Sequence, residues 1–157
     1  MTAAAGGQPA VAESALTSTI DNGNPRVYYL GGNNDVYELA WSGSNWNASD
    51  VTKAAGGTPA GAGSALTSTI YSGNPRVYYF GSHNNDVYEL AWSGNNWNAS
   101  DVTKAAGGLP AVTSALTSTI YSGNLRVYYL GSNYHIYELA WSGNNWSPRD
   151  VTADSVK

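Results

Sequence analysis

The chain has 157 residues, of which 11% are charged, and a formal net charge of −4 at pH 7. This acidic balance argues against nucleic acid or an anionic membrane surface as a partner, because both are bound through clustered Lys and Arg. The lack of cysteine excludes disulfides, thiolate metal sites and a cysteine nucleophile, and no apolar run reaches the roughly 18 residues of a membrane span.

One stretch of about 50 residues occurs three times. Ser14, Ser64 and Ser114 each open the heptapeptide Ser-Ala-Leu-Thr-Ser-Thr-Ile, so the period is 50 residues. Copy two has one extra residue in its Gly/Asn loop, a place where insertions are tolerated. We therefore expect one domain, 1–157, made of three tandem units at approximately 3–53, 54–104 and 105–157.

Each unit is predicted to hold four strands. In copy two they are Ser64–Tyr71, Arg76–Phe80, Asp86–Trp92 and Trp97–Thr103, separated by turn-forming residues at about ten-residue spacing. No window shows a sustained helical period. Four short strands repeated in this way are typical of β-propeller blades. The predicted fold class is all-β, a β-propeller with three four-stranded blades per chain.

Three blades do not close a ring, because propellers typically have four to eight. An arc of three would leave two apolar blade faces open, and apolar patches of that size mark interfaces. We expect a homodimer in which two chains complete a six-bladed ring with two-fold symmetry. The alternative is that the chain is part of a longer natural array.

Charged residues recur at one place in every copy. Three of the four arginines and three of the four glutamates are repeat residues, such as Arg76 and Glu89. Strand alternation puts these two side chains on one face if the loop sets Arg76 opposite Glu89, and Trp92 then lies on the other face. The alternative is a structural ion pair, but exposed pairs contribute only about 0–1 kcal/mol. We therefore expect that replacing the three repeat arginines with alanine abolishes ligand binding and leaves the melting temperature almost unchanged.

The two faces of a propeller blade line two different clefts. The Arg–Glu pair of one blade should therefore face the tryptophans of an adjacent blade. A sugar suits such a cleft, because its hydroxyls bind guanidinium and carboxylate groups and its C–H face packs on a flat aromatic ring. Simple packing between blades is the alternative role for any single tryptophan.

The motif runs Arg-Val-Tyr-Tyr, then Glu twelve or thirteen residues after the Arg, Trp three residues later and another Trp five beyond. It resembles the blade motif of the fucose-binding six-bladed propeller lectins of the Aleuria aurantia and Ralstonia solanacearum type, over about 21 residues of each copy. The resemblance implies that Arg, Glu and the first Trp hydrogen-bond sugar hydroxyls, while the second Trp packs on the sugar. The implied carbohydrate-binding residues are Arg26, Glu38, Trp41, Trp46, Arg76, Glu89, Trp92, Trp97, Arg126, Glu138, Trp141 and Trp146.

The resemblance also implies that each site takes Arg and Glu from one blade and its tryptophans from the following blade. Arg126 and Glu138 would then require Trp41 and Trp46 of a partner chain. The expected ligands are L-fucose and fucosylated glycans, bound at three sites per chain without catalysis, cofactor or metal.

Other functions have weaker support. Glycoside hydrolysis needs two carboxylates flanking one bond, whereas Asp50, Asp101 and Asp150 are expected at strand ends or turns. His83 and His135 are expected to be solvated loop residues, without partners at metal-ligand spacing. A propeller scaffold or protein-interaction module without a sugar ligand remains the alternative. The N-terminus lacks the features of a signal peptide, so we expect a soluble protein of open location.

Overall fold

The computed structural model describes residues 6–156, which form twelve strands and three short helices. The strands are β1 (Leu16–Asp21), β2 (Asn24–Leu30), β3 (Val36–Trp41), β4 (Trp46–Asp50), β5 (Leu66–Tyr71), β6 (Asn74–Phe80), β7 (Val87–Trp92), β8 (Trp97–Asp101), β9 (Ala111–Tyr121), β10 (Asn124–Gly131), β11 (Ile136–Trp141) and β12 (Trp146–Asp150). The helices are α1 (Val51–Ala54), α2 (Val102–Ala106) and α3 (Val151–Asp154), each far shorter than a bilayer is thick.

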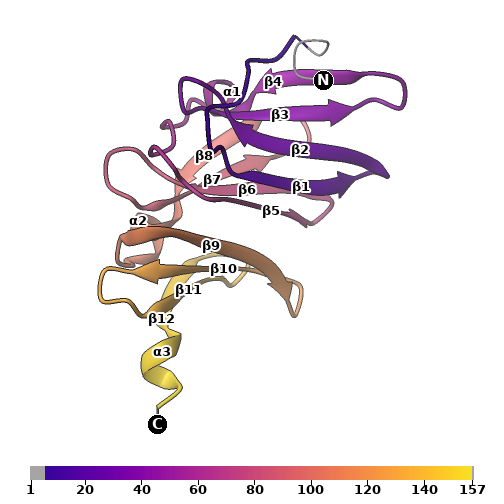
Figure 1. The fold of residues 1–157 in the computed structure, drawn as a ribbon. Helices are drawn as coiled ribbons and strands as arrows, with labels where there is room; N and C mark the ends of the chain where they lie inside the picture. The colour runs from indigo at the N-terminus through magenta and orange to yellow at the C-terminus, as the bar shows by residue number, and fades with distance from the viewer. Residues whose placement is uncertain (1–5, 157) are drawn as a thin grey trace.

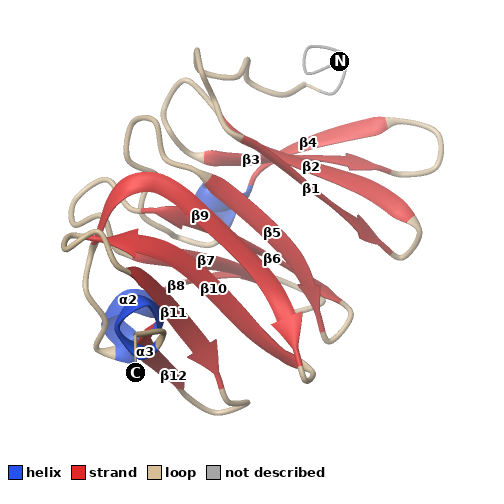
Figure 2. Ribbon diagram, turned by 60° about the horizontal axis from the view of Figure 1, so that its bottom comes forward, coloured by secondary structure: helices blue, strands red, loops and turns tan. Residues whose placement is uncertain are grey.

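The strands form three antiparallel sheets, which we call blade 1 (β1–β4), blade 2 (β5–β8) and blade 3 (β9–β12). Figure 1 shows the blades following one another from the N-terminus to the C-terminus, and Figure 2 shows them fanned apart. Their first strands lie side by side, joined by the hydroxyl pairs Thr17–Ser68 (2.8 Å) and Thr67–Ser118 (2.9 Å). The predicted all-β propeller arc of three four-stranded blades is thus confirmed.

The register of each central hairpin is not the one that sets the arginine directly opposite the glutamate. Tyr78, and not Arg76, lies directly opposite Glu89, while Arg76 lies opposite Ala91. The shift is two residues, so Arg76 and Glu89 still share a face, as diagonal neighbours. The tyrosine between them becomes part of the charged face.

The fourth strand of blade 2 ends at Asp101, two residues before the predicted end at Thr103. There the Asp101 carboxylate accepts a hydrogen bond from the Lys104 amide at 2.9 Å and starts α2. A carboxylate at this position satisfies an amide that the helix cannot pair, which favours a helical turn over a longer strand. Asp50 and Asp150 cap α1 and α3 in the same way, so these three aspartates do end strands, as predicted.

The hydrophobic core lies between blades. Tyr78, Phe80 and Val87 of blade 2 pack with Val127 and Leu139 of blade 3, and all five are buried. A second such layer joins blades 1 and 2. Because each blade is covered by its neighbours, burial at either end of the arc depends on whether a further blade is present.

The ends of the arc expose residues whose repeat equivalents are buried. Leu16 of blade 1 is 70% exposed, whereas Leu66 at the same position of blade 2 is 7% exposed. At the other end, Ile136 is 49% exposed and Val87 is fully buried. These two surfaces are the faces that a preceding and a following blade would cover.

Candidate functional site

A cleft of about 90 Å³ lies between blades 2 and 3. It is lined by Tyr71, Arg76 and Glu89 of blade 2 and by Leu125, Trp141 and Trp146 of blade 3. The structure thus brings the charged pair of one blade against both tryptophans of the next. We call this cleft site 2, and the corresponding junction between blades 1 and 2 site 1.

The guanidinium of Arg76 is held in place by hydrogen bonds from one of its nitrogens, Nη1. Its Nη1 donates to the carbonyl oxygens of Pro75 at 3.1 Å and of Trp92 at 2.9 Å. Its Nε lies 3.9 Å from Oε2 of Glu89, which is an ion-pair distance but too long for a hydrogen bond. Among the described residues, the Nε and Nη2 edge of Arg76 therefore makes no hydrogen bond with the protein.

Glu89 is held in a buried position. It is 9% exposed, and the Tyr78 hydroxyl donates a hydrogen bond to its Oε2 at 2.7 Å. Burial raises the pKa of Glu89 above its ordinary value, while Tyr78 and Arg76 oppose this shift by stabilising the ionised form. The result is a fixed carboxylate acceptor beside a fixed guanidinium.

These ion pairs are more buried than the low energetic value given to exposed pairs assumes. The side chains of Arg76 and Glu89 are only 16% and 11% exposed. The reason lies in the tertiary structure, since blade 3 covers this face of blade 2. Removing Arg76 would leave a buried carboxylate without its cation, which the sequence did not reveal.

The aromatic wall of site 2 is held in place by contacts with both blades. Trp141 and Trp146 lie directly opposite each other on β11 and β12, with ring centroids 5.5 Å apart. The ring of Trp146 also meets Tyr78 of blade 2 edge to face, at 6.3 Å between centroids. Both tryptophans remain partly exposed, so their rings face the cleft as well as the core.

Site 1 arranges its glutamate, its buried tyrosine and its two tryptophans in the same way. Tyr28 donates to Glu38 at 2.9 Å and meets Trp97 edge to face at 6.3 Å. Trp97 in turn packs on Trp92 at 5.6 Å. The predicted residues of blade 1 that carry charge are therefore adjacent to the tryptophans of blade 2.

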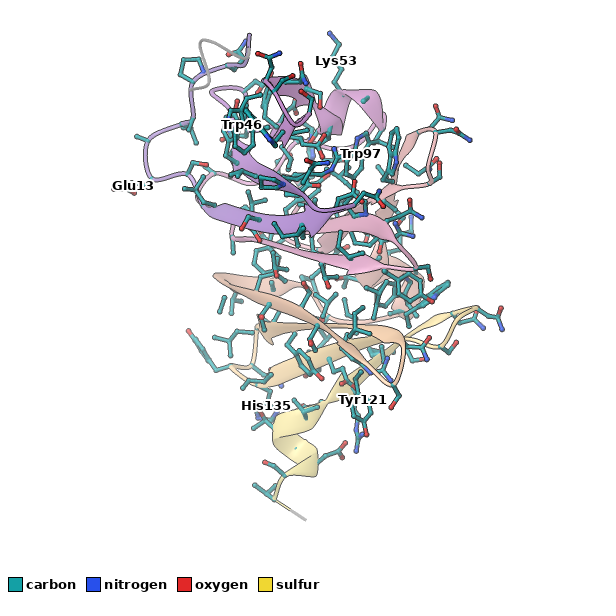
Figure 3. The ribbon with its side chains drawn as sticks, turned by 90° about the vertical axis from the view of Figure 1, so that its right-hand side faces the viewer. Glu13, Trp46, Lys53, Trp97, Tyr121 and His135 are labelled. Carbon is teal, nitrogen blue, oxygen red and sulfur yellow. The ribbon has the colours of Figure 1, made fainter. Side chains whose placement is uncertain are left out.

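The third set of predicted residues is divided between the two ends of the arc. Arg126 lies 3.6 Å from Glu138 at the open face of blade 3, and no blade follows within residues 6–156. Trp41 and Trp46 pack on each other in blade 1, with centroids 5.5 Å apart. Figure 3 shows Trp46 at one end of the arc and Tyr121, the neighbour of Arg126, at the other.

Two residues that line the cleft, Tyr71 and Leu125, were not identified from the sequence. Nor was Tyr78, which is fully buried and donates a hydrogen bond to Glu89. Tyr71 lies five residues before Arg76, with its ring 5.7 Å from the guanidinium carbon. The same spacing in copy three places Tyr121 at 5.8 Å from Arg126. This recurring Tyr-to-Arg spacing is the signal that could have found Tyr71.

The histidines differ from each other. His83 is exposed and contacts the Ser82 hydroxyl, as a solvated loop residue does. His135 is not simply solvated, because its Nδ1 lies 2.7 Å from Oδ2 of Asp150. Over the described part of the chain, no group of three or more His, Cys, Asp or Glu side chains is arranged to hold a metal ion.

Two larger cavities lack the chemistry of the clefts. One, of about 190 Å³, is lined by Gly61, Ala62, Ser64, Phe80, Asn85, Ala111 and Val112 and has no charged side chain. The other, of about 480 Å³, is lined by Ala115, Leu116, Thr117, Tyr128, Tyr129, Leu130 and Ile136. The second cavity is the uncovered face of blade 3.

Solved structures share this fold. The Aleuria aurantia lectin, described as a six-bladed β-propeller with a fucose recognition mode, is 24% identical with a TM-score of 0.67, over 90% of this chain and 46% of that one. A variant of that lectin in complex with alpha-methyl-L-fucoside is 26% identical with a TM-score of 0.67, over 87% of this chain and 45% of that one. This chain thus spans less than half the length of the Aleuria chains.

A fucose lectin from Kordia zhangzhouensis in complex with methyl-fucoside is closer in length. It is 25% identical with a TM-score of 0.61, over 86% of this chain and 97% of that one.

No curated protein matched the chain. The family model of the fungal fucose-specific lectins matches residues 8–157, which is nearly the whole sequence. Together with the repeated Arg, Glu and Trp set, this match shows that the chain belongs to the family of fungal fucose-specific lectins, which bind carbohydrate and do not convert it.

Proposed function

We propose that this protein binds L-fucose and fucosylated glycans at the clefts between its blades, with several sites acting together. The observation that carries the proposal is the composition of site 2, where Arg76 and Glu89 lie against Trp141 and Trp146. The family to which the chain belongs, and the methyl-fucoside held by the Kordia lectin, support the choice of sugar.

The chemistry of the cleft suits a monosaccharide. The Nε and Nη2 edge of Arg76 offers two parallel N–H donors, which fit two neighbouring hydroxyl groups. Glu89 supplies a carboxylate acceptor for a hydroxyl hydrogen. The indole rings of Trp141 and Trp146 supply a flat apolar surface and an N–H donor. We assign the corresponding roles to the same residues of the other two copies.

The open faces support assembly with a second copy of this chain. Leu16 and Ile136 are exposed at opposite ends of the arc, at positions that are buried between the blades of one chain. In a two-fold dimer each end would meet the opposite end of the partner, and both junctions would be covered. Trp41 and Trp46 of one chain would then complete the site begun by Arg126 and Glu138 of the other.

The resulting six-bladed ring would have six sites, four within chains and two shared between them. Several weak sites on one rigid body raise the effective concentration of ligand on a surface. We therefore expect weak binding of free sugar and much tighter binding to fucosylated surfaces.

Isothermal titration calorimetry with methyl α-L-fucoside tests the proposal. Binding near three sugars per chain is expected, together with a strong preference for surfaces dense in fucose. The methyl glycosides of mannose and galactose serve as matched ligands of different stereochemistry. No heat with any of the three sugars would contradict the proposal and favour a scaffold or protein-interaction role.

A further inference from the structure

The three arginines of the predicted sites do not have the same surroundings. Position 71 of blade 2 and position 121 of blade 3 are tyrosines, whose rings lie beside Arg76 and Arg126. The equivalent position of blade 1 is Asp21, which is 5% exposed. Site 1 thus has a second carboxylate where the other two have an aromatic ring.

Asp21 binds the edge of Arg26 that the other sites leave unused. Nε of Arg26 donates to Oδ2 of Asp21 at 2.8 Å. Nη1 lies 3.2 Å from Oε2 of Glu38. The guanidinium of Arg26 thus forms ion pairs with two carboxylates of its own blade, through Nε with Asp21 and through Nη1 with Glu38.

Arg76 and Arg126 are held differently. In each, Nη1 donates to two main-chain carbonyls of its own blade, which for Arg126 are those of Leu125 at 2.8 Å and Trp141 at 3.1 Å. Their Nε atoms lie 3.9 and 3.6 Å from the neighbouring glutamates, beyond hydrogen-bond distance. Their Nε and Nη2 edges are therefore available for two hydroxyl groups.

The local charge differs as well. Site 1 combines one guanidinium with the carboxylates of Asp21 and Glu38, whereas site 2 combines one guanidinium with Glu89 alone. Burial by itself would lower the pKa of Arg26, but Glu38 and Asp21 raise it above its ordinary value. The doubly paired arginine is the better stabilised cation, and a sugar hydroxyl must displace Asp21 to use its Nε.

We infer that Asp21 is a specificity-determining residue that makes site 1 a weaker fucose site than site 2. The inference rests on the proposed function, because it concerns how the same ligand is divided among the clefts. A sugar hydroxyl that binds Nε of Arg26 must replace the charge-assisted hydrogen bond between Nε and Asp21, which is stronger than a hydrogen bond to a neutral hydroxyl. We expect site 1 to bind methyl α-L-fucoside about tenfold more weakly than site 2.

The six tryptophans allow each cleft to be followed separately in one titration. Trp92 and Trp97 report on site 1, and Trp141 and Trp146 report on site 2. We would titrate ¹⁵N-labelled full chain with methyl α-L-fucoside and follow the assigned indole N–H signals by NMR. The site 1 signals should reach half their shift at about ten times the sugar concentration required by site 2.

Three variants connect this difference to Asp21. Asp21→Tyr copies a residue that blades 2 and 3 already accommodate, and it should bring the two midpoints to within about threefold. Asp21→Asn, which removes the charge without adding a ring, should give an intermediate value. The reciprocal Tyr71→Asp should weaken site 2 to the level of site 1, and it keeps the inference testable if Asp21→Tyr does not fold.

Equal midpoints for the two pairs of signals in the unmodified protein would overturn the inference and leave the proposed function intact. A site 1 midpoint that stays high in both Asp21 variants would also overturn it, because another residue would then be responsible. No shift in any of the six indoles at high sugar concentration would instead overturn the proposed function, and this inference with it.

Discussion

Glu89 is a buried carboxylate that belongs to both the blade interface and the candidate site. Its Oε2 accepts a hydrogen bond from Tyr78 and lies near Arg76, under the cover of blade 3. Buried charges are tolerated when they are paired and hydrogen-bonded, and they become costly when one partner is removed. Ligand binding and folding are therefore not independent at this position.

We expect Arg76→Ala to lower the free energy of unfolding by about 1–3 kcal/mol, because Glu89 stays buried without its cation. The double variant Arg76→Ala/Glu89→Gln should recover most of this loss, since the neutral amide needs no cation. Urea denaturation measures both effects, and both variants should lose sugar binding at site 2.

Arg149→Ala is the matched control for this prediction. The side chain of Arg149 is 63% exposed and pairs with Asp154 at 2.6 Å on the surface. Removing it should change stability by less than about 1 kcal/mol. If Arg76→Ala were no more destabilising than Arg149→Ala, the pair would not contribute to folding.

Blade 2 carries a pair of carboxylates where its third strand begins and its fourth strand ends. Asn84 Nδ2 donates to Asp86 at 2.7 Å and to Asp101 at 3.3 Å, which holds the two acids close together. Burial, followed by the charge of Asp101, raises the pKa of Asp86 to about 6. In blade 3, His135 replaces the first acid and contacts Asp150 directly.

The raised pKa predicts how stability changes with pH. Between the ordinary value of 3.8 and about 6, the folded chain holds the Asp86 proton more tightly than the unfolded chain does. This contribution to stability is present at low pH and is lost as the pH rises through that range. Asp86→Asn should therefore raise the melting temperature at pH 7 and flatten its dependence on pH between 4 and 6.

Blade 3 offers the reciprocal test. His135→Asp would place a second carboxylate beside Asp150, where the structure now has a histidine at 2.7 Å. The melting temperature at pH 7 should fall, and lowering the pH should restore part of this fall, because protonation of one carboxylate removes the repulsion. A thermal scan in which neither variant alters the pH profile would show that these carboxylates do not interact.

At the scale of the whole molecule, the arc is a stack of blades whose apolar faces need neighbours. Blade 2 is covered on both sides, whereas blade 1 exposes Leu16 and blade 3 exposes Ile136. Folding and assembly are expected to be coupled, because the same contact buries apolar surface and completes a site.

We expect Leu16→Glu to break the proposed dimer, since it places a charge in the junction. Light scattering after size exclusion should then give about the 16.5 kDa of one chain in place of twice that mass. Sugar stoichiometry should fall from near three to near two per chain, because the shared site loses its aromatic wall.

Leu109→Glu is the control for Leu16→Glu. Leu109 is 45% exposed, and copy two has Thr58 at the same position, so a polar side chain is tolerated there. This variant should remain a dimer. An unmodified protein that is monomeric and binds two sugars would contradict both the ring and the shared site.

The sequence by itself determined the parts of the molecule that follow from local patterns. The 50-residue repeat predicts three units, and turn residues between β-rich segments predict four strands in each. Alternation with a period of two places Arg76 and Glu89 on one face and Trp92 on the other. None of these conclusions requires knowing how the blades approach one another.

The tertiary structure decided what depends on that approach. Blade 3 covers Arg76 and Glu89, so the pair is largely buried and not partly exposed as the sequence suggested. The hairpin register placed Tyr78 against Glu89, and the fold placed Asp21 on the guanidinium of Arg26. Burial arises from contacts between blades, whereas the register and the Asp21–Arg26 pairing depend on how adjacent strands of one blade align. A pattern read along a single strand contains neither.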